Sequence, residues 1–245
     1  MTGYSYTRAP ETAAPLGMIV LQTDETLESD LRRMLPAHQP LYISRVPSAP
    51  QVTPESLRAM SGHITQAASL LPQAMPYAGV GYGCTSASAQ IGTGEVAKLI
   101  RAGVHTGHVT DPLSALIAAC EALGITRLAF LSPYTADVSG RLRDALGMAG
   151  IETPVFGSFE EADEASVVRI APHSITEAAC DLAAQSGTQG VFLSCTNLRT
   201  LDVIEQIEAC TGLPCLSSNQ VLAWALGRCI DMPVAIPGRL GQTGE

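Results

Sequence analysis

Apolar residues along this chain come in short uninterrupted runs, which alternate with longer segments where apolar and polar positions recur at helical spacing. A buried strand of a parallel sheet produces the first pattern, and a helix that covers the sheet produces the second. The alternation therefore predicts an α/β fold built on parallel sheet. In the first half, strands are predicted at residues 16–21, 41–46, 77–83 and 104–109, and helices at residues 26–34, 53–71, 89–101 and 113–123.

The second half of the chain repeats this order of elements. Strands are predicted at residues 127–132, 153–159, 190–194 and 213–216, helices at residues 136–148, 172–186, 201–210 and 218–230, and an extended surface tail at residues 231–245. The repeat predicts two pseudo-symmetric lobes, each a short parallel sheet flanked by helices, with the active site in the cleft between them. We assign residues 1–111 plus 218–245 to lobe 1 and residues 112–217 to lobe 2. A chance alignment of α/β units is the alternative explanation of the repeat.

One short segment in each half has the same pattern around a cysteine. A buried strand ends in the tripeptide CTS at residues 84–86, and another ends in CTN at residues 195–197. A thiol at this position meets the N-terminus of the next helix, where backbone N–H groups can lower its pKa. We therefore expect Cys84 and Cys195 to act as nucleophile or base from the two sides of a substrate. The alternative is that both are buried cysteines serving as small apolar residues.

The polar residues that follow each thiol are suited to bind an anion. Thr85, Ser86, Thr196 and Asn197 offer hydroxyl, amide and backbone N–H groups, which would stabilise a carboxylate before and during formation of a carbanion or enediolate. The same residues equally suit ordinary capping of the following helices. The two roles are compatible.

Composition narrows the class of protein. The 245 residues are 46% hydrophobic and 15% charged, which is typical of a compact soluble enzyme. The net charge is −9 and the 14 Lys and Arg residues form no run, so we expect no nucleic-acid partner. No stretch reaches the roughly 20 apolar residues of a membrane span, and we expect no membrane partner. Seven cysteines without a CxxC pair indicate a reduced, cytoplasmic protein. The histidines show no metal-ligand spacing with the cysteines, so no metal site is predicted.

Three motifs are more specific than either tripeptide alone. The segment at residues 190–202 reads GVFLSCTNLRTLD, the segment at residues 83–86 reads GCTS, and the segment at residues 132–138 reads SPYTADV. Together they resemble the aspartate/glutamate racemase superfamily and, within it, the branch of maleate cis–trans isomerase and arylmalonate decarboxylase. The first is close to that branch's SC-x-x-LRT-x-D stretch. In the second, isomerases and racemases keep the thiol that decarboxylases lack. The resemblance covers most of the chain, from about residue 16 to residue 224.

The resemblance implies a cofactor-independent isomerase or racemase that uses Cys84 and Cys195 on a small carboxylate substrate. Tyr134 matches the tyrosine that hydrogen-bonds a substrate carboxylate in this superfamily, with Thr85 and Ser86 binding the same group. In a maleate isomerase one thiolate adds to the double bond, the resulting single bond rotates, and elimination gives the trans product. In a racemase the two thiols exchange one proton across a stereocentre. The resemblance also implies a homo-oligomer without metal or organic cofactor.

Two departures from the family pattern bear on the substrate. Isomerases carry Asn in a motif like PSSNTTME, where this chain has LQTDETLE at residues 21–28, which puts Asp24 in place of the amide. Glu164 aligns roughly with a second family Asn. A carboxylate in place of an amide removes a hydrogen-bond donor and repels a dicarboxylate. If Asp24 faces the pocket, a substrate with one carboxylate and an amino or amidino group fits better than maleate. Capping of the helix near Thr26 is the alternative role of Asp24.

The same segment is similar to ectoine-utilisation members of this branch, whose compounds are amino-carboxylates of that type. Two other functions stay open. One is a decarboxylase or lyase that uses Cys195 alone as proton donor, although the presence of Cys84 argues against it. The other is a non-catalytic two-lobe protein that binds a small ligand, which would not need two thiols at strand ends.

Overall fold

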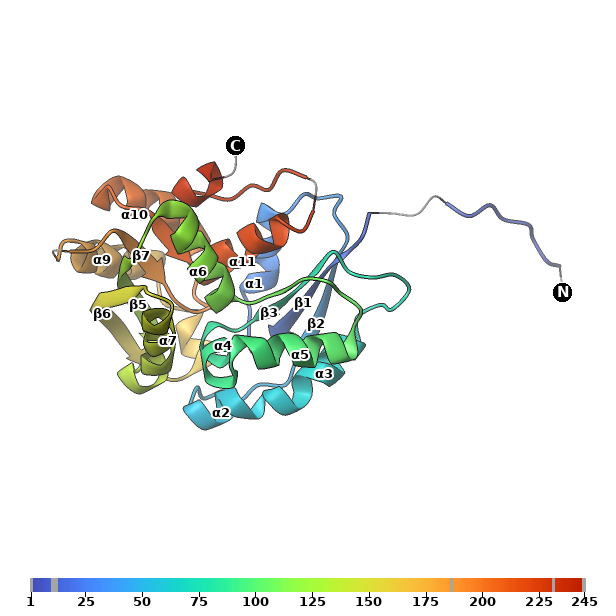
Figure 1. Ribbon diagram of the computed structural model, residues 1–245, viewed down its shortest axis with the longest axis horizontal. Helices are drawn as coiled ribbons and strands as arrows, with labels where there is room; N and C mark the ends of the chain where they lie inside the picture. The colour runs from blue at the N-terminus through green and yellow to red at the C-terminus, as the bar shows by residue number, and fades with distance from the viewer. Residues whose placement is uncertain (1, 10–12, 186, 231, 244–245) are drawn as a thin grey trace.

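The computed structural model contains two four-stranded parallel sheets, each flanked by helices. It describes residues 2–9, 13–185, 187–230 and 232–243. Figure 1 shows the two sheets in different halves of the molecule. The prediction of an α/β fold with two similar halves is confirmed.

The two sheets have the same strand order. The first is β2-β1-β3-β4 and the second is β6-β5-β7-β8, and neighbouring strands in both are parallel. The strands are Leu16–Leu21 (β1), Leu41–Val46 (β2), Gly79–Gly83 (β3), Val109–Thr110 (β4), Arg127–Tyr134 (β5), Glu152–Glu161 (β6), Gly190–Leu193 (β7) and Cys215–Ser217 (β8). Each cysteine turn therefore follows the same strand of its sheet, β3 in the first and β7 in the second.

Most of the helices lie where their patterns predicted them. They are Leu27–Met34 (α1), Pro54–Ala59 (α2), Ser61–Ser69 (α3), Thr85–Ile91 (α4), Thr93–Gly103 (α5), Pro112–Leu123 (α6), Ala136–Met148 (α7), Glu164–Val167 (α8), Pro172–Ala183 (α9), Ile204–Thr211 (α10) and Ser218–Gly227 (α11). Two 3₁₀ turns, Leu201–Val203 (η1) and Arg239–Gln242 (η2), complete the elements of the described residues.

Two predicted helices are each divided in the structure. The predicted helix 53–71 is interrupted at Met60, which separates α2 from α3. The predicted helix 89–101 begins earlier, at Thr85, and is interrupted at Gly92, where φ is 94°. That backbone conformation is open to glycine but strained for other residues, so Gly92 marks the boundary between α4 and α5.

Three other predictions differ from the structure. The strand predicted at residues 104–109 is reduced to β4, and the four-residue helix α8 was not predicted. The C-terminal segment is not simply an extended surface tail, because η2 buries Leu240 against the core. Residues 186, 231 and 244–245 of the predicted elements lie outside the described residues.

Helices α6 and α11 join the two halves. Leu116 and Cys120 of α6 lie in one apolar cluster with Phe130 and Phe192 of the second sheet, although α6 directly follows the first. Helix α11 follows the second sheet but contacts α1 and β3, as well as α6 and β8. The predicted lobe limits at residues 111 and 217 stay a prediction.

None of the described helices is long and apolar enough to cross a membrane.

Candidate active site

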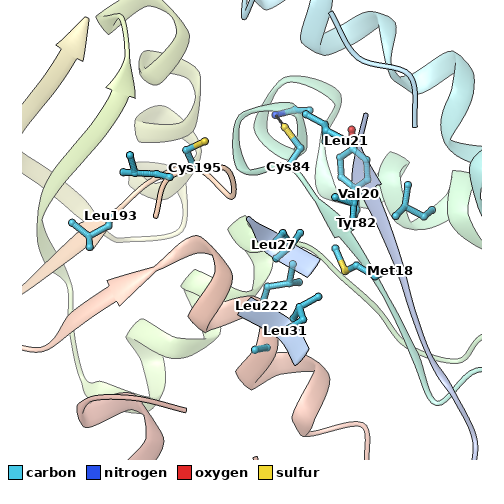
Figure 2. Close-up of a cluster of buried hydrophobic side chains, with 14 of the residues drawn as sticks. Met18, Val20, Leu21, Leu27, Leu31, Tyr82, Cys84, Leu193, Cys195 and Leu222 are labelled. Carbon is cyan, nitrogen blue, oxygen red and sulfur yellow. Dashed lines mark hydrogen bonds between the residues drawn. The ribbon is translucent and has the colours of Figure 1, made fainter. Parts of the chain in front are cut away.

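One cavity between the two sheets brings together every residue that the sequence analysis assigned to the site. It is small, about 10 Å³, which is room for about one water molecule. It is lined by Asp24, Cys84, Thr85, Ser86, Tyr134, Glu164, Cys195, Thr196 and Asn197, and by the apolar side chains of Leu21 and Leu57. Apart from Leu57 of α2, these residues lie at the ends of β1, β3, β5, β6 and β7 or shortly after them, so the carboxyl ends of strands from both sheets meet at this point. Figure 2 shows Cys84 and Cys195 on the two sides of this region.

Cys84 occupies the N-cap position of α4, directly after β3. Its sulfur accepts a hydrogen bond from the backbone N–H of Ala87 over 3.4 Å, and the residue is 7% exposed. The preceding residue is Gly83, and a Cβ there would force the end of the Leu27 side chain, at the start of α1, to shift. The missing side chain thus lets α1 pack closely beside the first thiol.

Cys195 lies in the corresponding turn after β7, in a strained backbone conformation. Its φ is 94°, which residues other than glycine rarely adopt. Its sulfur accepts the backbone N–H of Asn197 over 3.3 Å, and its own N–H donates to the hydroxyl of Ser218 over 3.0 Å. The turn therefore directs two backbone N–H groups at defined acceptors, one of which is the thiol itself.

Both thiols have raised pKa values, which corrects the expectation that the helix N-termini lower them. Burial raises the pKa of Cys84 to about 12, and the charges of Glu164 and Asp24 add to the effect. For Cys195, burial is again the main cause, followed by the charge of Glu164, and its pKa lies well above the usual range. The N–H donors of Ala87 and Asn197 act in the opposite direction, but desolvation of the thiolate outweighs them.

Tyr134 joins Cys195 to a buried glutamate. The Tyr134 hydroxyl donates to Oε1 of Glu164 over 2.7 Å and lies 2.9 Å from the sulfur of Cys195. Asn197 donates from Nδ2 to Oε2 of Glu164 over 2.9 Å. Burial still raises the pKa of Glu164, although both of these hydrogen bonds lower it, and the nearby charge of Asp24 raises it further.

Asp24 both caps a helix and faces the cavity. Its Oδ1 accepts the backbone N–H groups of Thr26 and Leu27, each over 2.8 Å. Its Oδ2 is buried and has no hydrogen-bond partner among the described residues. The Thr196 hydroxyl is close enough to lower the pKa of Asp24, but its hydrogen bond goes to the carbonyl of Gly83 over 3.2 Å. Burial dominates and raises the pKa of Asp24.

Among the described residues, no group of three or more His, Cys, Asp or Glu side chains is arranged to hold a metal ion.

Comparison with known proteins gives the family. The family model described as arylmalonate decarboxylase matches residues 37–241. The chain belongs to the arylmalonate decarboxylase family. Its relatives include the maleate isomerase of Nocardia farcinica, 26% identical over 233 residues that cover 91% of this chain and 92% of the relative. They also include the arylmalonate decarboxylase of Bordetella bronchiseptica, 30% identical over 128 residues that cover 47% of this chain and 48% of the relative.

Solved structures of this family have the same fold. A cysteine-to-alanine variant of the maleate isomerase Iso from Pseudomonas putida S16, crystallised with maleate, superposes with a TM-score of 0.82 at 22% identity, covering 94% of this chain and 98% of that one. A mutant of arylmalonate decarboxylase in the liganded form superposes with a TM-score of 0.80 at 26% identity, covering 93% and 98%. The placement in the maleate isomerase and arylmalonate decarboxylase branch of the aspartate/glutamate racemase superfamily is confirmed. A closer relation to ectoine-utilisation proteins has no support in these comparisons.

Two residues next to the cavity, Ser218 and Asn219, were not predicted to belong to the site. The hydroxyl of Ser218 accepts from Thr85 over 2.8 Å as well as from the N–H of Cys195. Asn219 donates to the carbonyl of Thr196 over 2.9 Å and to Asp30 over 2.8 Å. The sequence could have indicated both residues, because they closely follow the predicted strand 213–216. Ligands bind at the carboxyl ends of parallel strands.

Proposed function

We propose that this protein is a cofactor-independent isomerase or racemase that acts on a small carboxylate with Cys84 and Cys195 on opposite sides of the substrate. One observation carries the proposal: matched thiols from the two halves of the chain line a single cavity. A reaction that moves a proton between two faces of a carbon atom needs an acid–base group on each side, and two thiols can supply them. Two buried cysteines used only for packing would not need to share a polar cavity.

Two reactions suit this pair of thiols. In the first, the thiolate of one cysteine removes a proton from the carbon next to the carboxylate, and the thiol of the other returns a proton from the opposite face. In the second, one thiolate adds to a carbon–carbon double bond, the new single bond rotates, and elimination restores the thiolate. A cysteine-to-serine mutant of the Nocardia farcinica maleate isomerase holds a covalently bound succinylcysteine intermediate, which supports the second reaction in a relative.

The remaining polar groups favour an anionic group near each thiol. Ser86 lies in the first turn of α4 and lines the cavity, as do Thr196 and Asn197 after the second thiol. Tyr134 lies at the same cavity, although its hydroxyl donates to Glu164 in the structure. A carboxylate placed among these groups would be held where negative charge develops during proton removal.

Asp24 and Glu164 favour a substrate that also carries a hydrogen-bond donor. The Oδ2 atom of Asp24 is a buried acceptor without a partner among the described residues, and such an atom is costly unless a ligand supplies a donor. An ammonium or amidinium group would donate to it and would favour the charged form of Asp24, which burial disfavours, whereas a second carboxylate, as in maleate, would raise the pKa of Asp24 further. We therefore infer a substrate with one carboxylate and one amino or amidino group. Amino-carboxylates formed in ectoine breakdown are compounds of this type.

A decarboxylase that uses Cys195 as proton donor is the second candidate. The match to the Bordetella bronchiseptica arylmalonate decarboxylase favours it. Cys84 argues against it, because one thiol is enough for protonation after loss of carbon dioxide.

Incubation in deuterium oxide tests these functions together. The protein is mixed with maleate, with amino-carboxylates and with an arylmalonate, and the products are followed by nuclear magnetic resonance. We expect deuterium at the carbon next to the carboxylate, or isomerisation, for a member of the second group. Cys84→Ala and Cys195→Ala should each lower the rate by about 10²–10⁴-fold, while Cys210→Ala, an exposed thiol, should not. Efficient turnover of maleate would contradict the substrate class, and unchanged turnover in either variant would contradict the two-thiol mechanism.

A further inference from the structure

A continuous chain of hydrogen bonds runs from Cys195 through Tyr134 to Glu164. The Tyr134 hydroxyl has one proton, which it donates to Oε1 of Glu164 over 2.7 Å. Its oxygen is then free to accept, and the Cys195 sulfur lies 2.9 Å away. The arrangement therefore directs the S–H of Cys195 at the tyrosine oxygen and the O–H of the tyrosine at the carboxylate.

We propose that Glu164 is the proton acceptor for Cys195, with Tyr134 passing the proton between them. This rests on the proposed function, in which Cys195 has to become a thiolate in at least one direction of the reaction. The S–H bond of Cys195 breaks as an O–H bond forms at Tyr134, and the original Tyr134 proton moves to Oε1 of Glu164. The negative charge passes from Glu164 to Cys195, and no electrons are gained or lost overall.

The transfer resolves an electrostatic conflict in the cavity. Cys195 is 4% exposed and Glu164 is 5% exposed, so two negative charges at these positions would repel each other with little solvent to screen them. Loss of the Cys195 proton to solvent would create that pair of charges. Transfer to Glu164 keeps the buried charge at one unit, so a thiol with a raised pKa can still react.

Asn197 holds both ends of this chain. Its backbone N–H donates to the Cys195 sulfur over 3.3 Å, and its side-chain Nδ2 donates to Oε2 of Glu164 over 2.9 Å. Its own amide orientation is set because Oδ1 accepts the backbone N–H of Glu25 over 2.9 Å. Asn197 therefore donates a hydrogen bond to the negative charge both when it is on Glu164 and when it is on the Cys195 sulfur.

The other titratable groups near the chain are mostly acidic. Asp24 faces it from the loop after β1, Cys84 from the end of β3, and Asp163 from the start of α8. Arg45 is the nearby cation, and its charge acts on Asp24. Each acidic group opposes a second negative charge on the pair, which favours transfer within the pair over loss of a proton to solvent.

The test is the pH dependence of Cys195 alkylation, which needs no substrate. Iodoacetamide labelling of Cys195 is followed by mass spectrometry in a Cys84→Ala background, with and without Glu164→Gln. With Glu164 present, the labelling rate should be independent of pH above the pKa of Glu164. In that range the form with a Cys195 thiolate and a protonated Glu164 carries the same number of protons as the form with a Cys195 thiol and an ionised Glu164. In the Glu164→Gln variant, the rate should rise about tenfold per pH unit across the same range, because the proton must leave to solvent.

Three further measurements complete the design. Glu177→Gln, an exposed glutamate on α9, should keep the pH-independent range. Glu164→Asp retains the carboxyl group and should keep that range at a lower rate. A tenfold rise per pH unit with Glu164 in place overturns the proposal, and this result needs no Glu164 variant to fold. The labelling experiment does not depend on turnover. A tenfold rise per pH unit would therefore contradict only the proton transfer to Glu164 and not the proposed two-thiol reaction. Absence of turnover would contradict the proposed reaction without changing the pH dependence of labelling.

Discussion

The hydroxyl of Thr85 donates to the hydroxyl oxygen of Ser218 over 2.8 Å, and the same oxygen accepts the backbone N–H of Cys195 over 3.0 Å. Thr85 directly follows the first thiol, so one serine connects the two cysteine turns. The contact explains how turns from different sheets are held at a defined separation. Ser218 therefore has one hydrogen bond to each cysteine turn.

Replacement of Ser218 by alanine should weaken this connection. The variant leaves the N–H of Cys195 and the hydroxyl of Thr85 buried without their acceptor, and each unsatisfied group costs about 1–3 kcal/mol. We expect the free energy of unfolding to fall by about 2 kcal/mol or more in urea titrations. Ser69→Ala, which removes an exposed hydroxyl on α3, is the control and should leave it unchanged. A Ser218→Ala protein as stable as wild type would contradict this role.

Replacement of Asp24 by asparagine should reverse the preference for ligand charge. The new amide still offers an oxygen to the N–H groups of Thr26 and Leu27, but it presents an N–H₂ group in place of Oδ2. Affinity for a ligand with an ammonium group should fall about 10–100-fold, as expected for a lost hydrogen bond to a charged group, and affinity for a dicarboxylate should rise. Calorimetric titration measures both.

Asp111→Asn is the matched control for that experiment. Asp111 is a buried aspartate that caps α6 through Leu113 and Ser114, and it does not line the cavity. Its replacement should change stability without changing the preference between the two ligands. Equal preference in wild type and the Asp24→Asn variant would show that Asp24 only caps α1.

The backbone of Cys195 predicts an unusual order of stability among its variants. At a φ of 94°, a residue with a side chain is strained and glycine is not. We expect Cys195→Gly to be more stable than Cys195→Ala by about 1 kcal/mol, despite glycine's greater freedom in the unfolded chain. Denaturant unfolding of the two inactive variants compares them directly. The opposite order would mean that the turn relaxes when the sulfur is removed.

Asp30 should make stability depend on pH. Burial raises its pKa from 3.8 to about 6, against the hydrogen bond from Asn219 that lowers it. The folded protein therefore holds this proton more tightly than the unfolded chain, so stability falls as pH rises from about 4 to about 6. The change for this group is about 3 kcal/mol.

The measurement compares unfolding free energies at pH 4 and pH 7 in wild type and Asp30→Asn. The other buried carboxyl groups are the same in both proteins, so the difference reports on Asp30 and its charge interactions with Asp24 and Asp202. The variant should lose less stability between the two pH values, by about 3 kcal/mol. Asp181→Asn, at an exposed position on α9, should follow wild type. Parallel pH profiles for wild type and Asp30→Asn would show that the pKa of Asp30 is the same in the folded and unfolded chain.

Much of the site could be predicted because parallel strands deliver their carboxyl ends to one place. Cys84 and Cys195 follow equivalent strands, and Asp24 follows β1, so their meeting in a cavity needed only the strand order. The breaks at Met60 and Gly92 were missed, because apolar spacing continues across both positions.

The electrostatic character of the site could not be predicted from local sequence. The helix N-terminus after Cys84 argues for a lowered pKa, but the observed direction depends on burial by both halves and on Glu164. The position of Glu164 in turn depends on α8, a helix of 4 residues that is too short to produce a pattern. The contact between Thr85 and Ser218 joins residues 133 positions apart, which no local motif indicates.

The packing of α6 and α11 has a consequence for the origin of the molecule. Helix α6 packs in one apolar cluster with the second sheet, and α11 contacts both β3 and β8, so each helix crosses to the other half as an exchanged element does in a swapped dimer. A half-length ancestor with a single set of these elements would have had an uncovered apolar surface as a monomer. Two copies would have covered each other and placed one cysteine turn from each copy at a shared interface. A single chain that carries both turns permits the two thiols to differ in role, which two identical subunits cannot do.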